Sequence, residues 1–223
     1  MRVLLTGGGS GIGRAVARAL LARGDEAVLT ARSQERADEI AADLPGASFL
    51  VADLAHPGTL NGLGRDLAGP VDALVHCAGV VTLAPVALAR LDDWQRQLDV
   101  NLISPAVLTR ELLPLLRQSK GQVIFVNSTA GLQAGAGWSA YAASKFGLHA
   151  LADSLRAEEP DIAVTSVFPS RTATPMQRSV REQEGAPYNA EDWMSPESVA
   201  TAILGVLDLP SDAAIIDLTV KTR

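Results

Sequence analysis

Tyr141 and Lys145 are the two residues whose types and spacing point most directly to chemistry. They stand four residues apart in a stretch of helical periodicity, so both side chains project from one face of a helix. A free phenol has a pKa of about 10, and bringing it to neutrality takes about 4 kcal/mol of preferential stabilisation of the phenolate. A nearby ammonium could contribute to this, and such a tyrosine would serve as a general acid or base. The same spacing is also common in a pair on an amphipathic surface.

Ser128 and Asn101 are two further polar candidates. Ser128 follows an apolar strand-like run, at the edge where ligands of a parallel sheet gather, so its hydroxyl could hold a substrate oxygen beside Tyr141. A serine at a strand end is also a frequent turn former. Asn101 falls in a long helical stretch, where asparagine is a mediocre helix former, and it could order water and pass protons from Lys145 to bulk solvent.

The first strand-like run ends in a glycine-rich turn, TGGGSGIG at residues 6–13, which opens the first helix. Glycines let the main chain approach a ligand closely, and a helix N-terminus offers unpaired N–H groups and positive potential. This context predicts a dinucleotide diphosphate site. The alternative is a tight strand-to-helix turn without a ligand.

The end of the second strand-like run bears on which dinucleotide would bind. No carboxylate occupies this tip to hold ribose hydroxyls, and Arg32 follows directly, where it could accommodate a 2'-phosphate. We therefore favour NADP(H) over NAD(H), although Arg32 could also be a solvated residue that starts the second helix. Asp53, after the third strand, could accept a hydrogen bond from the adenine amine or cap the following turn.

Short apolar runs alternate with longer helical stretches over most of the chain, which is typical of stacked βαβ units. Most of the strand-like runs are continuously apolar, as expected for a parallel sheet covered on both faces. We expect strands at Val3–Thr6, Ala27–Thr30, Ser48–Ala52, Ala73–His76, Val123–Asn127, Ala163–Phe168 and Ala214–Leu218.

The intervening stretches predict helices, and right-handed crossovers then build a doubly wound sheet with ligands beyond the carboxyl ends of its strands. The segment 170–194 lacks a strand signal and could be a mobile flap over a pocket or an ordinary surface excursion. We expect helices at Ile12–Ala22, Gln34–Asp43, Gly58–Leu67, Asp92–Arg117, Ala140–Glu158 and Glu197–Leu207.

Composition narrows the class of protein. The 223 residues fit one α/β domain over 1–223, and a net charge of −6 argues against nonspecific binding to nucleic acid or to anionic lipid. One cysteine and three histidines offer no spacing that resembles a metal cage. The least charged long stretch, 73–89, is too short to span a membrane, and the first strand-like run directly follows Met1. We expect a soluble cytoplasmic protein without a leader.

Together these motifs resemble the short-chain dehydrogenase/reductase family, in order and over essentially the whole chain. The glycine turn at 6–13 matches the family's cofactor motif, and Asp53-Leu54 matches its adenine-contacting pair. Asn101, Ser128, Tyr141 and Lys145 match its catalytic tetrad, with Ser128 thirteen positions before Tyr141. The resemblance implies a single-domain Rossmann-type α/β fold, with a seven-stranded parallel sheet and helices on both faces.

The resemblance also implies roles for individual residues. Tyr141 would protonate the carbonyl oxygen, Lys145 would hold the nicotinamide ribose, and Ser128 would position the substrate. Family members usually pair through the helices at Asp92–Arg117 and Ala140–Glu158, so a homodimer or homotetramer is expected. The cofactor-binding residues would be Thr6, Gly7, Gly9, Ser10, Gly11, Ile12, Gly13, Arg32, Asp53, Leu54, Ala78, Gly79, Tyr141, Lys145, Pro169, Thr172 and Thr174.

The chain departs from the family pattern at two places. The Asn-Asn-Ala-Gly element is replaced by His76-Cys77-Ala78-Gly79, where we expect a structural His76 and an inert, buried Cys77. The usual Pro-Gly after the sixth strand is replaced by Pro169-Ser170, followed by Arg171. Arg171 could bind an anionic or polar group of the substrate, or lie on the surface.

Three functions fit these observations. The favoured one is an NADP(H)-dependent oxidoreductase that transfers a hydride between nicotinamide and a carbonyl or secondary alcohol of a small molecule. An NAD(H)-dependent alcohol dehydrogenase is the alternative within enzymes. A non-catalytic dinucleotide-binding sensor is the alternative outside them, although such a chain would be expected to lose Tyr141 or Lys145.

Overall fold

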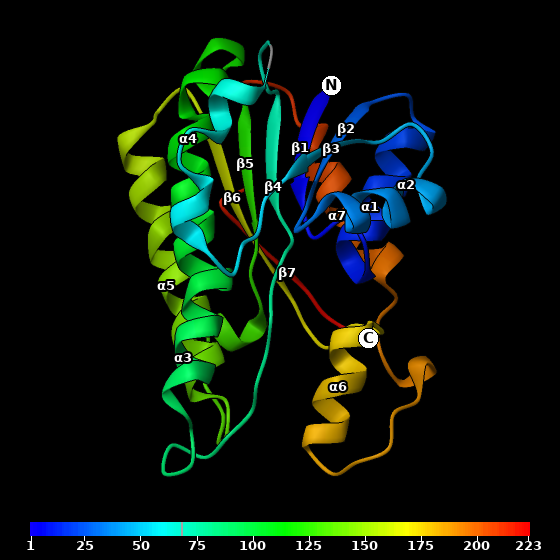
Figure 1. Ribbon diagram of the computed structural model, residues 1–223, viewed down its shortest axis with the longest axis vertical. Helices are drawn as coiled ribbons and strands as arrows, with labels where there is room; N and C mark the ends of the chain where they lie inside the picture. The colour runs from blue at the N-terminus through cyan, green and yellow to red at the C-terminus, as the bar shows by residue number, and fades with distance from the viewer. Residues whose placement is uncertain (68) are drawn as a thin grey trace.

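The fold is a seven-stranded parallel sheet with strand order β3-β2-β1-β4-β5-β6-β7 (Figure 1). The computed structural model describes residues 1–67 and 69–223. The sheet order turns back between β1 and β4, the type of crevice in which doubly wound folds bind their ligands. The strands are β1 (Arg2–Thr6), β2 (Glu26–Ala31), β3 (Ser48–Val51), β4 (Ala73–His76), β5 (Gln122–Val126), β6 (Ala163–Pro169) and β7 (Asp217–Val220).

Helices cover both faces of the sheet, as Figure 1 shows. One further helix, α6 (Pro175–Gln183), lies beyond the carboxyl ends of the strands rather than on a face (Figure 1). The helices α1 (Gly11–Ala22), α2 (Gln34–Asp43) and α7 (Pro196–Leu207) lie on one face, and α3 (Leu91–Leu98), α4 (Ser104–Ser119) and α5 (Ser139–Glu158) lie on the other.

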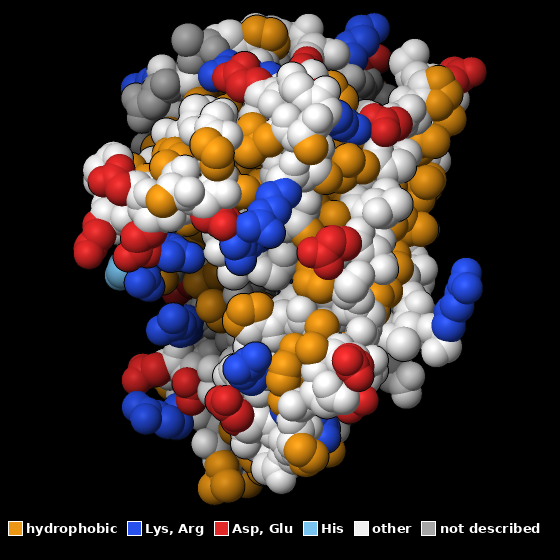
Figure 2. Space-filling view, turned by 90° about the vertical axis from the view of Figure 1, so that its right-hand side faces the viewer, with side chains coloured by type: hydrophobic (Ala, Val, Ile, Leu, Met, Phe, Trp, Pro, Cys, Tyr) orange, Lys and Arg blue, Asp and Glu red, His pale blue; other side chains and the backbone are white. Residues whose placement is uncertain are grey.

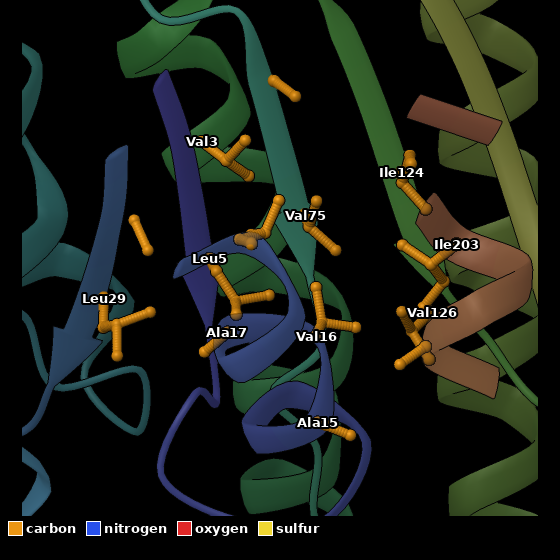
Figure 3. Close-up of a cluster of buried hydrophobic side chains, with 14 of the residues drawn as sticks. Val3, Leu5, Ala15, Val16, Ala17, Leu29, Val75, Ile124, Val126 and Ile203 are labelled. Carbon is orange, nitrogen blue, oxygen red and sulfur yellow. The ribbon is translucent and has the colours of Figure 1, made fainter. Parts of the chain in front are cut away.

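Two hydrophobic clusters hold the layers together, because successive strand residues point to opposite faces of the sheet. Leu5 and Val75 face α1 and α7, where they join Val16 and Ile203 in one buried cluster (Figure 3). The adjacent Leu4 points the other way, into the cluster beneath α4 and α5. The single-domain doubly wound fold is therefore confirmed.

The outer surface carries both signs of charge. On the side that includes α1 and α2, Figure 2 shows basic and acidic side chains interspersed rather than gathered by sign. Arg14 and Arg18 of α1, for example, both pair with Asp43 at the end of α2. Within residues 1–67 and 69–223, no helix is long and apolar enough to cross a membrane.

The helix expected at Gly58–Leu67 is wrong. The chain forms two short 3₁₀ turns there instead, Pro57–Leu60 and Leu63–Asp66. Gly62 separates them with a φ of +89°, a left-handed conformation that interrupts a right-handed helix. The Gly62 amide donates to the Glu111 carboxylate on α4 at 2.7 Å, so the turn is tied to the helix behind it.

The single helix expected at Asp92–Arg117 is also interrupted. Between α3 and α4 the chain forms a π-helical turn, Asp99–Ile103, which contains Asn101. A π turn changes the direction of the side chains that follow it and is frequent at functional sites. The last expected strand, Ala214–Leu218, begins three residues later, because pairing with β6 starts at Asp217.

The segment 170–194 has more structure than its sequence suggests. It contains α6, whose N-cap Thr174 accepts a hydrogen bond from the Gln177 amide and is followed by Pro175 at the first helical position. A bridge between Thr172 and Met194 closes the base of the segment. We call residues 170–194 the flap, and its ends are anchored beside the sheet.

We expect Leu112→Ala to lower the free energy of unfolding by about 2–5 kcal/mol, because Leu112 of α4 is fully buried in the cluster beneath that helix. Leu88→Ala is the matched control, since Leu88 is 74% exposed, and it should change stability by about 0.5 kcal/mol or less. Urea unfolding followed by circular dichroism measures both. Equal losses in the two variants would contradict the packing described above.

Candidate active site

Two adjoining cavities open at the carboxyl ends of the central strands. The central cavity has a volume of about 440 Å³ and is lined by Ser128, Tyr141 and Lys145. The glycine-loop cavity, of about 690 Å³, follows the turn after β1 towards the ends of β2 and β3. Ile12, Cys77, Gly79, Thr174 and Met176 line both cavities, so one elongated ligand can occupy the two together.

The glycine turn forms a cradle that larger residues would fill. Gly7 has a φ of +72°, and a Cβ there would lie 2.8 Å from the Ala78 backbone; a Cβ at Gly13 would collide with the carbonyl oxygen of Gly7. The Ser10 side chain makes no capping hydrogen bond to α1, which leaves the N–H groups of its first turn facing the cavity mouth. Backbone donors at a helix N-terminus fit the diphosphate of a dinucleotide.

Thr6 lines neither cavity, unlike the other residues of the glycine motif that were predicted to bind the cofactor. Its buried hydroxyl oxygen accepts hydrogen bonds from the backbone amides of Cys77 and Ala78, both at 3.1 Å. Thr6 therefore fixes the end of β4 beside the glycine turn, and Ala78 and Gly79 line the glycine-loop cavity.

The far end of the glycine-loop cavity is basic. Arg32 is exposed at the tip of β2 and lines it, and no ion pair of Arg32 is present among the described residues. Arg36 and Arg96 line the same cavity and were missed by the sequence analysis. The Arg36 guanidinium reaches the carbonyl oxygen of Gly9 at 3.5 Å, which places α2 directly against the glycine turn.

Asp53 lines this cavity together with Leu54. Its carboxylate accepts a hydrogen bond from the Ala55 amide at 3.0 Å and faces His56 Nδ1 at 2.9 Å. The Ala55 amide, followed by His56, lowers the pKa of Asp53 below its usual range. The capping role expected as one alternative is therefore present, and the carboxylate also borders the cavity.

Tyr141 and Lys145 lie one turn apart on α5, and their side chains are only 6% and 3% exposed. The Lys145 ammonium donates to the carbonyl oxygen of Val126 at 3.0 Å and lies 5.8 Å from the centroid of the Tyr141 ring. Ser128 directly follows Asn127 after β5, lines the same cavity and lies near enough to Tyr141 to lower the pKa of its phenol. The structure thus brings three of the four predicted catalytic residues into the central cavity.

Burial sets the protonation of this group. It raises the pKa of Tyr141 to about 12, against the opposing hydrogen bond from Ser128, and it lowers the pKa of Lys145 to about 8. The lysine by itself therefore does not lower the pKa of the phenol towards neutrality. At neutral pH the phenol keeps its proton, which is the form that donates to a carbonyl oxygen.

Asn127 was missed by the sequence analysis. Its side-chain amide donates to the backbone carbonyl of Lys145 at 3.0 Å and its oxygen accepts from the Ser128 amide at 2.9 Å. Asn127 therefore ties the strand that bears Ser128 to the helix that bears Lys145. The only signal in the sequence is a polar residue directly before Ser128, at the end of an apolar run.

Asn101, the fourth predicted catalytic residue, is fully buried in the π turn and lines neither cavity. Its amide exchanges two hydrogen bonds with the backbone of Val80, at 2.8 and 2.9 Å, and donates to the Ser144 hydroxyl at 3.0 Å. A Cβ built on Gly79 would lie 3.4 Å from the Asn101 side-chain oxygen and 3.9 Å from Lys145 Nζ. Asn101 thus braces the chain beside the lysine.

His76 and Cys77, which replace the two asparagines of the family pattern, both have surroundings that fit a structural role. His76 is buried, stacks on Phe125 with 5.0 Å between ring centroids, and lies 2.9 Å from the Thr109 hydroxyl. Burial lowers the pKa of His76 to about 3, with a smaller contribution from the charge of Lys145. Burial also raises the pKa of Cys77 to about 12, so its thiol stays protonated at neutral pH.

The flap completes both cavities. Thr174 lines both, and its side chain approaches the glycine turn, since a Cβ on Gly11 would lie 3.0 Å from its methyl carbon. Pro169, Thr172 and Arg171 line the central cavity. Trp138 and Gln177 line it too, and neither stood out in the sequence.

Comparison with known proteins identifies the family of this chain. The family model described as short chain dehydrogenase matches residues 1–185. The dehydrogenase/reductase SDR family member 7B of Bos taurus is 33% identical over 92% of this chain and 70% of its own length. Glycine betaine reductase ATRR of Emericella nidulans is 32% identical over 99% of this chain, which spans 18% of that protein. The structure of serine dehydrogenase complexed with NADP+ has a TM-score of 0.87 and 25% identity, over 99% of this chain and 94% of that one.

The chain belongs to the short-chain dehydrogenase/reductase family, because the family model matches most of its length. It is an oxidoreductase of that family, which uses NAD(P)(H), and the similar serine dehydrogenase was solved with NADP+. The glycine turn, the helix N-terminus behind it and the adjoining cavities described above fit a dinucleotide of this kind.

We expect acid to destabilise the protein through His76. The folded-state pKa of about 3 lies below the unfolded value of about 6.5, so below pH 6.5 the unfolded chain takes up a proton that the folded chain does not. Stability should fall by up to about 1.4 kcal/mol per pH unit as the pH drops from 6.5 towards 3. Urea unfolding between pH 5 and 7.5 measures this slope.

His76→Asn should be less stable at pH 7.5 yet show a flatter slope, and His56→Asn, at an exposed histidine, should keep the original slope. A His76→Asn protein whose stability falls with acid as steeply as that of the wild type would contradict this assignment.

Proposed function

We propose that this protein is an NADP(H)-dependent oxidoreductase that interconverts a carbonyl group and a secondary alcohol of a small molecule. The observation that carries the proposal is the convergence of Tyr141, Lys145 and Ser128 on one cavity that adjoins the glycine turn. A redox reaction of this kind needs a dinucleotide that reaches the carbonyl carbon and a proton donor that reaches its oxygen; the glycine-loop cavity offers a place for the first and the central cavity holds the second.

Each residue has a defined task in carbonyl reduction. The cofactor, when bound, supplies the hydride to the carbonyl carbon. The Ser128 hydroxyl binds the carbonyl oxygen, and the Tyr141 phenol, held protonated by burial, donates its proton to that oxygen as negative charge develops there. Lys145, fixed by the Val126 carbonyl, holds the nicotinamide ribose and keeps positive charge close to the phenol as it deprotonates.

Asn101 and Asn127 are positioning residues in this proposal. Asn127 holds the Lys145 backbone against Ser128, and Asn101 holds Val80 and Ser144 beside them. The proton relay from Lys145 to solvent through Asn101 that the sequence analysis suggests would run past Gly79, which both side chains approach.

The preference for NADP(H) rests on charge at the end of β2. Arg32, Arg36 and Arg96 all line the glycine-loop cavity, whereas Asp53 is its only acidic lining residue among those described. Asp53 is already engaged by Ala55 and His56. An exposed guanidinium at the tip of β2 is the feature that accommodates a 2'-phosphate, and serine dehydrogenase, similar in structure, was solved with NADP+.

Self-association through α4 and α5 is part of the proposal. Phe146 on α5 is 44% exposed and Ile103, directly before α4, is 38% exposed. These large exposed apolar side chains, one on α5 and one directly before α4, support a contact between copies of the chain at these two helices.

Tyr141→Phe tests the reaction. Removal of the phenolic proton donor should lower kcat for NADPH-dependent carbonyl reduction by about 10²–10⁴-fold, while the Kd for NADPH stays within a factor of about three. The decrease in NADPH absorbance measures kcat, and fluorescence titration measures the Kd for NADPH. Tyr188→Phe is the matched control, because Tyr188 is the second tyrosine of the chain and lines neither cavity in the described part. Undiminished turnover in Tyr141→Phe would refute the proposed role.

Arg32→Asp tests the cofactor preference. The change replaces a partner for the 2'-phosphate with a carboxylate, so we expect the Kd for NADPH to rise at least tenfold, about 1.4 kcal/mol, while NADH binds equally well or better. Arg90→Asp, an equal change of charge at an exposed site outside both cavities, should leave both affinities unchanged. The preference is wrong if NADPH affinity is the same in Arg32→Asp as in the wild type.

A further inference from the structure

The central cavity is lined by cations without acidic residues. Lys145 and Arg171 are the charged groups among its described lining residues, and no aspartate or glutamate is among them. Lys145 lies deep, against Val126, whereas Arg171 extends from the flap. A cavity of this kind favours a ligand that carries negative charge or several acceptor oxygens.

Arg171 is held rigidly at this position. Its guanidinium lies between two indole rings, 5.7 Å from the ring of Trp138 and 5.4 Å from that of Trp193. Two of its nitrogens donate to the Glu184 carboxylate, one of them at 2.9 Å. A guanidinium has five N–H donors, so three remain for a ligand.

The ion cluster around Arg171 has an excess of positive charge. Glu184 accepts from Arg181 at 2.7 Å as well as from Arg171, so two guanidiniums share one carboxylate. The cluster of Arg171, Arg181 and Glu184 therefore keeps one net positive charge at the wall of the central cavity. One uncompensated charge matches a monoanion such as a carboxylate better than the dianion of a phosphate monoester.

Gln177 provides an independent indication of a ligand. Its side chain is 6% exposed, lines the same cavity from α6, and its amide nitrogen has no hydrogen-bond partner among the described residues. An unpaired buried amide costs about 1–3 kcal/mol, and a ligand oxygen at this position would remove that cost.

We propose that the substrate carries a carboxylate, which Arg171 and Gln177 bind while the reacting carbonyl or alcohol faces Ser128 and Tyr141. The substrates are then oxo acids and the corresponding hydroxy acids. Trp138 lies next to both groups that would hold the two ends of the substrate. Its ring centroid is 5.7 Å from that of Tyr141 and 5.7 Å from the Arg171 guanidinium, so the indole forms an apolar wall for the carbon skeleton between them. This inference rests on the proposed function for the reaction, but the anion site itself does not depend on turnover.

A pair of ketones that differ in charge tests the proposal. We expect kcat/KM for NADPH-dependent reduction of 4-acetylbenzoate to exceed that for its methyl ester at least tenfold. Arg171→Gln should reduce this ratio at least tenfold through KM, with little effect on the ester or on the Kd for NADPH. Arg178→Gln, also in the flap but directed at Tyr188 and outside the cavity lining, is the matched control and should keep the ratio.

A second variant guards against a loosened flap. Glu184→Gln weakens the same contact but leaves the guanidinium of Arg171 in place, so it should keep or increase the preference for the acid, whereas a loosened flap alone would lose it. A ratio near one in the wild type, or a ratio unaffected by Arg171→Gln, would overturn the proposal.

Binding of a non-reacting acid separates this proposal from the proposed function. Trp138 and Trp193 flank Arg171, so benzoate should change tryptophan fluorescence saturably in a Trp94→Phe background, whereas benzamide should not. If neither ketone is reduced but benzoate binds and Arg171→Gln abolishes binding, the anion site stands and the proposed reaction fails. Equal responses to benzoate and benzamide would refute the anion site.

Discussion

The burial of the Lys145 ammonium is the constraint on which the rest of the site depends. Moving a charged amine out of water is costly, and the lowered pKa of Lys145, about 8, reflects that cost. The carbonyl oxygen of Val126 repays part of it with a hydrogen bond of 3.0 Å. That carbonyl belongs to the last residue of β5. The lysine is therefore held only if the end of β5 and the part of α5 that carries Lys145 lie side by side.

Neighbouring hydrogen bonds maintain this alignment of strand and helix. Asn127 links the end of β5 to the Lys145 backbone, and Asn101 links the π turn to Ser144 on α5. Leu148 and Ala152 anchor the same helix in the core cluster beneath it. Tyr141 and Ser128 inherit their positions from these contacts, since one lies a turn before the lysine and the other directly follows Asn127. The relative positions of Tyr141, Ser128 and Lys145 thus follow from the packing of α5 against the sheet.

The sequence predicted those parts of the molecule that follow from local periodicity. Continuous apolar runs marked the strands, and the order of strand, glycine turn and helix marked the cradle at Gly7–Gly13. It did not predict features that depend on distant contacts. Gly62, which separates the two 3₁₀ turns, donates its amide to Glu111, 49 residues away. The π turn at Asp99–Ile103 is stabilised by the hydrogen bonds of Asn101 to Val80 and Ser144. The helix α6 was missed because few of its residues are apolar and several of them line the two cavities rather than pack in the core.

The weakest sequence signal therefore coincides with the element that joins the two cavities. Through Thr174, α6 reaches the glycine turn, and through Gln177 and Val180 it borders the central cavity. The groups proposed to carry out the reaction lie on α5 and directly after β5, against the core, where a change of side chain also costs packing. The groups that would recognise the rest of a substrate, Arg171 and Gln177, lie outside the sheet, on a segment held by capping, ion pairs and stacked tryptophans. Residues there can differ without disturbing the core, so this division lets the same reaction machinery serve differently shaped and charged substrates.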